Sequence, residues 1–142
     1  MNIRLADSND FEAIYELTNQ LEEKILDRDG FRGAFDYALN NDRICVLEEE
    51  GKVLAFLHMR ISPQLCRASD ILEIRELCVN ERCRSKGFGR ILLQKAEECA
   101  KERGIGEIEI LSSTRRKRAH RFYEANDYEV TGYRFFKKDK GI

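Results

Sequence analysis

One segment sets the architecture of this chain: Val79-Asn80-Glu81-Arg82-Cys83-Arg84-Ser85-Lys86-Gly87-Phe88-Gly89-Arg90-Ile91-Leu92-Leu93. It joins an apolar strand pattern to the clearest helix pattern of the sequence. Glycines let the backbone approach a ligand, and the N–H groups of a first helical turn have no acceptor within the helix. Together with the helix dipole, these N–H groups favour a phosphate. Four basic residues surround Gly87 and Gly89, namely Arg82, Arg84, Lys86 and Arg90. The segment therefore predicts a diphosphate site, and a tight turn that needs glycine for its backbone angles is the alternative.

This loop matches neither of two common phosphate motifs. It lacks the Gly-x-x-x-x-Gly-Lys-Ser/Thr pattern, and Arg90 follows Gly89 where a dinucleotide fingerprint continues toward a third glycine. The predicted ligand is therefore a diphosphate-bearing molecule of another class.

In the rest of the chain, segments whose apolar residues recur at helical spacing alternate with segments whose apolar residues recur at strand spacing. Helices are expected from Asp7 or Ser8, over residues 31–39, from the glycine loop to Gly104, and over residues 117–125. Strands are expected at residues 3–5, 44–47, 53–61, 71–79 and 107–110, with Ser62-Pro63 ending the third. A hairpin of residues 128–130 and 133–136 is expected to complete the sheet. This order predicts an α/β chain, with one mixed sheet flanked by about four helices.

Composition narrows the class of protein. With 142 residues, 42% of them hydrophobic and 36% charged, one domain over residues 1–142 is expected. The net charge of −1 argues against nucleic acid or an anionic membrane as a partner. No apolar run suits a signal peptide or a membrane span. Five cysteines without Cys-x-x-Cys spacing favour free thiols in a reducing compartment, so a cytoplasmic location is expected.

Two separated motifs carry a family resemblance. The segment quoted above resembles the acetyl-CoA-binding segment of the GCN5-related N-acetyltransferases (GNAT superfamily), and Ala119-His120-Arg121-Phe122-Tyr123-Glu124 resembles that family's second conserved stretch. Several local stretches are most similar to the aminoalkylphosphonate N-acetyltransferases, including Gly30-Phe31-Arg32 and Glu73-Ile74-Arg75-Glu76-Leu77. Two positions depart from the family pattern. Arg116 stands where many members have asparagine, which leaves one cofactor contact in doubt, and Asp127 replaces a glycine, although Asn126-Asp127 can still form a left-handed turn.

The resemblance implies acetyl-CoA as cosubstrate and a set of residues that contact it. The backbone of Leu77, Cys78 and Val79 would contact the pantetheine arm and the acetyl group. The pyrophosphate would be held by the glycine loop, that is by Arg84, Ser85, Lys86, Gly87, Phe88, Gly89 and Arg90.

The resemblance also implies catalytic roles. Tyr123 takes the family's general-acid position, and a phenol with a pKa of about 10 can protonate a leaving thiolate. Packing on the apolar side of a short helix is its alternative role. Glu73 takes the position of the base in the histone-acetylating branch. Glu76 competes with it, because strict alternation puts residues 73 and 76 on opposite faces, and a bulge in this strand would change that parity.

Substrate-side groups are less specific. Arg32 and His58 are candidates for binding a phosphonate or carboxylate of the substrate, which needs a cation. A lone histidine on a strand is more often structural, and a lone arginine is usually a solvated surface group. Glu76 is a further substrate-side candidate. No metal is expected, because no His, Cys and carboxylate cluster has ligand spacing. The basic run of residues 115–118 suits coenzyme A phosphates, nucleic acid or a solvated helix start.

We therefore expect an acetyl-CoA-dependent N-acetyltransferase that acetylates the primary amine of a small molecule, an aminoalkylphosphonate being the favoured case, by direct attack. Two other functions stay open: acetylation of a protein lysine or N-terminus, and a non-catalytic coenzyme A-binding regulatory module. The expected partner is the small-molecule amine, and a homodimer is expected by analogy alone.

Overall fold

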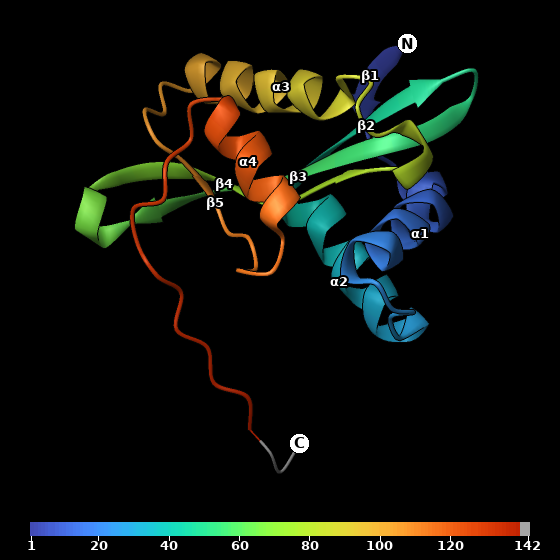
Figure 1. The fold of residues 1–142 in the computed structure, drawn as a ribbon, viewed down its shortest axis with the longest axis horizontal. Coiled ribbons are helices and arrows are strands. Elements are labelled where there is room, and N and C mark those ends of the chain that lie inside the picture. Colours follow the sequence, from blue (N-terminus) through green and yellow to red (C-terminus); the bar gives the residue numbers. More distant parts are fainter. Residues whose placement is uncertain (140–142) are drawn as a thin grey trace. The chain divides into compact units, whose positions relative to one another are not determined.

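A mixed sheet organises residues 1–110 in the computed structural model, which describes residues 1–139 (Figure 1). Its order is β1-β2-β3-β4-β5. The strands are β1 (Asn2–Leu5), β2 (Arg43–Glu49), β3 (Lys52–Gln64), β4 (Ser69–Val79) and β5 (Ile108–Ile110). The first four strands pair antiparallel, and β5 pairs parallel to β4. A parallel neighbour needs a long crossover, which here includes the helix that follows the glycine loop.

The chain divides into two compact units, Met1–Ile110 and Leu111–Ile142. The first unit contains all five strands and the helices α1 (Phe11–Glu22), α2 (Arg28–Asn41) and α3 (Phe88–Glu102). The described part of the second unit, residues 111–139, contains α4 (Lys117–Ala125). The predicted α/β fold with a mixed sheet is confirmed, and the predicted bounds of α4 are those observed.

Side-chain caps determine where the first two helices begin. The Asp7 carboxylate accepts from the Asn9 N–H, and Asp10 accepts from the Asp7 N–H, so a short 3₁₀ turn leads into α1. The Asp27 carboxylate accepts from the Gly30 N–H, and α2 therefore begins earlier than the apolar pattern predicts. The predicted cap at Asp7 is confirmed.

The two faces of the sheet are covered by different helices. Figure 1 shows α3 on the side of the sheet opposite to α1 and α2. On the α1–α2 side, Phe11, Ile14 and Phe35 pack with sheet residues Ile44 and Val46, all buried. On the other side, α3 buries Leu92, Leu93 and Ala96 almost completely. Burial on both faces explains why the central strands read as continuous apolar runs.

The expected end of β3 at Ser62-Pro63 is wrong, because the strand continues to Gln64 and Pro63 pairs with Asp70. The pairing of β2 with β3 stops at Met59, so among the described residues β3 has only β4 beside it at Pro63. A residue without an N–H donor is tolerated where a strand has a neighbour on one side only.

The expected C-terminal hairpin is absent, because residues 128–139 contain no strand in the described part of the chain. Tyr133 and Phe135 are 91% and 94% exposed. A two-stranded hairpin is marginal in water without a third strand or a helix against it. The turn before the segment is as predicted, since Asp127 has a φ of 70°.

All five cysteines are free thiols, and Cys45, Cys78 and Cys99 are buried in the core. Among residues 1–139, none of the helices has the length and apolar character that crossing a bilayer requires.

Candidate active site

The glycine loop leads directly into the start of α3. After a short 3₁₀ turn at Glu81–Cys83, Ser85 and Gly87 both adopt positive φ angles, of 67° and 84°. Gly87 is the N-cap of α3, and no side chain caps the helix there. The first-turn amides of Phe88, Gly89 and Arg90 therefore receive no side-chain cap and have no acceptor in the preceding turn. This arrangement is suited to an anion.

Gly87→Ala is expected to destabilise the fold by about 1–2 kcal/mol, because an L residue is strained in the left-handed region. A Cβ at this position would meet nothing within 4 Å, so the cost comes from the backbone rather than from a clash. Gly33→Ala is the matched control, since Gly33 lies inside α2 with equally open space and should gain up to about 1 kcal/mol. Urea denaturation measures both, and equal effects of the two substitutions would contradict the argument.

A second feature of the candidate site is an open strand edge. β5 pairs with β4 only from Leu72 to Ile74, and β3 pairs with the other edge of β4 as far as Val79. Within residues 1–139, the stretch Leu77, Cys78 and Val79 therefore has a neighbouring strand on one side only. This stretch lies a few residues before the glycine loop in the same unit.

A β-bulge brings the two candidate base residues to one face of the sheet. His58 lies opposite Glu76, and the next residue, Met59, lies opposite Ile74, so Arg75 is the extra residue. The register then puts Arg60 opposite Glu73. Since His58 and Arg60 are two apart on β3, Glu73 and Glu76 share their face. Strict alternation, which separates the two carboxylates, is therefore wrong here, and the bulge is the reason.

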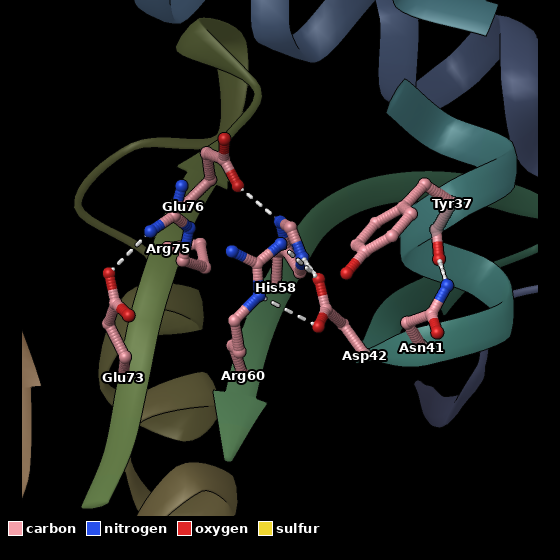
Figure 2. Close-up of polar contacts among 8 residues, drawn as sticks. All are labelled: Tyr37, Asn41, Asp42, His58, Arg60, Glu73, Arg75 and Glu76. Atoms are coloured by element: carbon pink, nitrogen blue, oxygen red, sulfur yellow. Dashed lines mark hydrogen bonds and ion pairs between the residues drawn. The ribbon is translucent and has the colours of Figure 1, made fainter. Parts of the chain in front are cut away.

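Four of these side chains form a continuous chain of polar contacts, which we name the His58 network: Arg60, Asp42, His58 and Glu76 (Figure 2). The Arg60 guanidinium donates two bonds of 2.9 Å to the Asp42 carboxylate. The two ring nitrogens of His58 lie 2.8 Å from Asp42 Oδ2 and 2.5 Å from Glu76 Oε2. Because each contact needs a hydrogen between the heavy atoms, the ring satisfies both carboxylates fully only as an imidazolium.

The electrostatics agree with this geometry. Burial alone lowers the pKa of His58, but the hydrogen bonds and charges of Glu76 and then Asp42 outweigh it, so this pKa lies above its ordinary value. Burial raises the pKa of Asp42, but the bonds from Arg60 and His58 outweigh it and lower that pKa. The network therefore contains a fixed charge at Asp42 and a titrating group at His58.

Glu73 lies in a different environment from Glu76. Arg75 Nη1 donates to Glu73 Oε1 at 2.6 Å, so this carboxylate is paired with a permanent cation (Figure 2). The two predicted base candidates therefore differ in partner, one having an arginine and the other a histidine.

Asp42 and Arg60 were not predicted as site residues. Asp42 is the C-cap of α2, where a carboxylate faces the negative end of the helix dipole. Its side chain is only 2% exposed. Its burial at an unfavourable helix end is visible only in the structure, and no motif in the sequence indicates it.

Arg32 is not part of the His58 network. Its guanidinium carbon lies 3.6 Å from the centre of the Phe11 ring, over the aromatic cluster of α1 and α2. The side chain is exposed, so it forms a surface cation–π contact. Within residues 1–139, no group of three or more His, Cys, Asp or Glu side chains could hold a metal ion.

In the second unit, Tyr123 lies on α4 as predicted. Its ring packs 5.5 Å from Phe122 and 6.3 Å from Tyr128, between ring centres. The Tyr123 carbonyl accepts from the N–H groups of Asn126 and Tyr128 where the helix ends. These contacts fix the backbone of the tyrosine at the last turn of α4.

The class of protein is now defined. The sequence model of the acetyltransferase (GNAT) family matches residues 11–128, so the chain belongs to this family and is an N-acetyltransferase by class, as the resemblance indicated. An aminoalkylphosphonate N-acetyltransferase of Salmonella typhimurium is 31% identical over 137 residues, 95% of this chain and 89% of that protein.

Solved structures agree with this class at the level of the fold. A transcriptional regulator of Bacillus halodurans aligns with a TM-score of 0.87 at 21% identity, covering 97% of this chain and 99% of that one. An aminoglycoside 6′-N-acetyltransferase of Acinetobacter haemolyticus aligns with a TM-score of 0.84 at 16% identity, covering 99% of both chains. At these identities the likeness extends to the fold alone.

Proposed function

We propose that this protein transfers the acetyl group of acetyl-CoA to the primary amine of a small molecule, and that aminoalkylphosphonates are its preferred class of acceptor. Three features that follow one another within one unit carry the proposal. They are the edge of β4 beyond the end of β5, the glycine loop, and a helix start without a side-chain cap. The similarity to the Salmonella typhimurium enzyme supports the class of acceptor.

The cofactor contacts follow from this arrangement. Backbone groups of residues 77–79 would bind the pantetheine arm as an additional strand would, since that edge has no neighbouring strand in residues 1–139. The amides of residues 85–89 would bind the pyrophosphate, aided by the side chains of Arg84 and Arg90.

The chemical roles are shared among three kinds of group. Tyr123 would give a proton to the departing thiolate. A carboxylate on the bulged face, Glu73 or Glu76, would receive the proton that the acceptor ammonium must lose before it can attack. Arg32 and His58 are the cations proposed for the substrate side. Of the two, His58 lies on the same face as both carboxylates, whereas Arg32 packs over the Phe11 ring of α1.

We further propose that both units form one acetyltransferase domain over residues 1–142, since the family match of residues 11–128 includes parts of both. Five free thiols suit the reducing cytoplasm, which we propose as its location. A homodimer is proposed by analogy.

The function is tested by following thiol release from acetyl-CoA with aminomethylphosphonate, aminoethylphosphonate and a panel of other primary amines. We expect amine-dependent release, fastest with the phosphonates. Release that needs no amine, or none with any amine, would overturn the proposal. A preference for a lysine peptide would replace the small-molecule acceptor with a protein.

A further inference from the structure

The proton acceptor can be assigned more narrowly, on the condition that the proposed function holds. We propose that Glu76 and His58 act together as the base that deprotonates the acceptor ammonium, and that Asp42 is a positioning residue that holds the imidazole. This assignment adds Asp42 to the site and makes His58 a proton carrier rather than a binder of the substrate's anionic group.

The network leads inward from solvent. The exposed fraction of the side chain falls from 36% at Glu76 to 13% at His58 and 2% at Asp42. A proton received at the Glu76 carboxylate is therefore 2.5 Å from a ring nitrogen of the less exposed His58. Asp42 is in turn fixed by two bonds from Arg60, so the far end of the chain cannot move easily.

The partner of each carboxylate separates Glu76 from Glu73. An ordinary glutamate has a pKa of about 4.3 and an alkylammonium such as lysine about 10.4, so a lone carboxylate is a weak acceptor. An imidazole is a better match, and a carboxylate in contact with one can pass the proton on. The guanidinium beside Glu73 is always protonated and cannot accept it. Of the two pairs, Glu76–His58 and Glu73–Arg75, the first can therefore hold the extra proton and the second cannot.

The groups around the imidazole support its role. Glu76 faces it from β4 and Asp42 from the end of α2. Arg60 of β3 reaches it through Asp42, and the Tyr37 ring of α2 lies 5.7 Å from the Arg60 guanidinium carbon. Arg75 and Glu73 pair with each other farther along β4. The two carboxylates in contact with the ring raise its affinity for a proton.

The proposed acetyl transfer moves three protons. At a pH above its raised pKa, His58 begins neutral, with its Nε2–H donated to Asp42. The acceptor R–NH₃⁺ gives one proton to Glu76, which shares it with His58 Nδ1 to form the imidazolium that both carboxylates fit. The amine lone pair attacks the thioester carbonyl carbon, a C–N bond forms, the C–S bond breaks and its electron pair leaves on sulfur. As the amide forms, Tyr123 gives its phenolic proton to the thiolate, which becomes the thiol, and the phenolate takes up the second proton that the nitrogen loses. The shared proton returns to water.

The first test is an NMR titration, which does not depend on activity. The chain has two histidines, so a His120→Gln variant identifies the His58 ring signals. We expect His58 to titrate above the ordinary imidazole value, and lower in Asp42→Asn and in Glu76→Gln. The matched control is Glu48→Gln, another part-exposed carboxylate of the sheet, bound to Arg4 at 2.8 Å, which should leave the titration unchanged.

The second test is the pH profile of kcat/KM with an amine acceptor. The acidic limb should coincide with the NMR midpoint and move to lower pH in Asp42→Asn, with little change in KM for acetyl-CoA. Glu76→Gln should lower kcat by about 10²–10³-fold and abolish that limb. Because Glu76 is the exposed end of the network, its variant remains decisive even where Asp42→Asn does not fold.

The outcomes separate this inference from the proposed function. In an active enzyme, the inference is overturned if the acidic limb of the pH profile stays in place in both Asp42→Asn and Glu76→Gln. It is also overturned if Glu73→Gln is the one variant that abolishes this limb. An ordinary His58 titration midpoint also overturns it. A wild-type protein that acetylates no amine and binds no coenzyme A removes both.

Discussion

Tyr123→Phe is expected to lower kcat by about 10²–10³-fold while the KM for acetyl-CoA changes by less than about threefold. The substitution removes one oxygen and keeps the ring, so the packing of Tyr123 against Phe122 and Tyr128 is retained. If the phenol protonates the leaving thiolate, its loss is felt in the transition state and hardly at all in cofactor binding. Steady-state kinetics with saturating amine give both constants.

Tyr133→Phe is the matched control for that measurement. Tyr133 is 91% exposed, so removal of its hydroxyl should leave kcat unchanged. Equal turnover of Tyr123→Phe and wild type would remove Tyr123 from the mechanism and leave it a packing residue of α4. A parallel rise of KM with an unchanged kcat would assign it to binding instead.

Asp42→Ala should have the largest effect on folding, about 3 kcal/mol, because it leaves two cationic partners without their anion. Arg60 and His58 both donate to this carboxylate, which is 2% exposed. The comparison is Glu12→Ala, which removes one partner of the exposed Arg28–Glu12 ion pair and should cost less than about 1 kcal/mol. Urea denaturation of both variants and wild type measures the difference.

The cost of Asp42→Ala should also depend on pH in a defined direction. The folded pKa of His58 is raised, so its contribution is complete below the unfolded value of about 6.5 and is lost as the pH rises through the folded pKa. The Arg60–Asp42 contact has no such dependence in this range. The loss of stability should therefore be larger at slightly acidic than at alkaline pH. An equal loss of stability at the two pH values would show that the contact between Asp42 and protonated His58 does not stabilise the fold.

Local signals in the sequence predicted most of the fold correctly. Apolar periodicity located the three helices of the first unit and the five strands of its sheet, and the glycine loop gave the start of α3. The errors lie where the presence of a neighbouring strand determines whether a strand forms or continues. Pro63 stays in β3 because, within residues 1–139, β4 is the one strand beside it there. The pattern of residues 128–136 suits strands, but a strand also needs a partner, which alternation cannot supply.

The site shows the same division. The resemblance indicated Glu73, Glu76 and His58, but one sequence could not tell whether the two carboxylates share a face. That depends on a single extra residue, Arg75, in the ladder between β3 and β4. Asp42 was missed because it is brought to His58 by the end of α2 and not by any motif.

The central claim is that the loop from Arg84 to Arg90 binds coenzyme A, and calorimetric titration with coenzyme A tests it most directly. We expect saturable heat at one site per chain, with affinity about tenfold weaker in Arg84→Ala, in line with one lost charge-assisted contact. Absence of binding heat at high ligand excess, with wild-type protein shown to be folded, would contradict it.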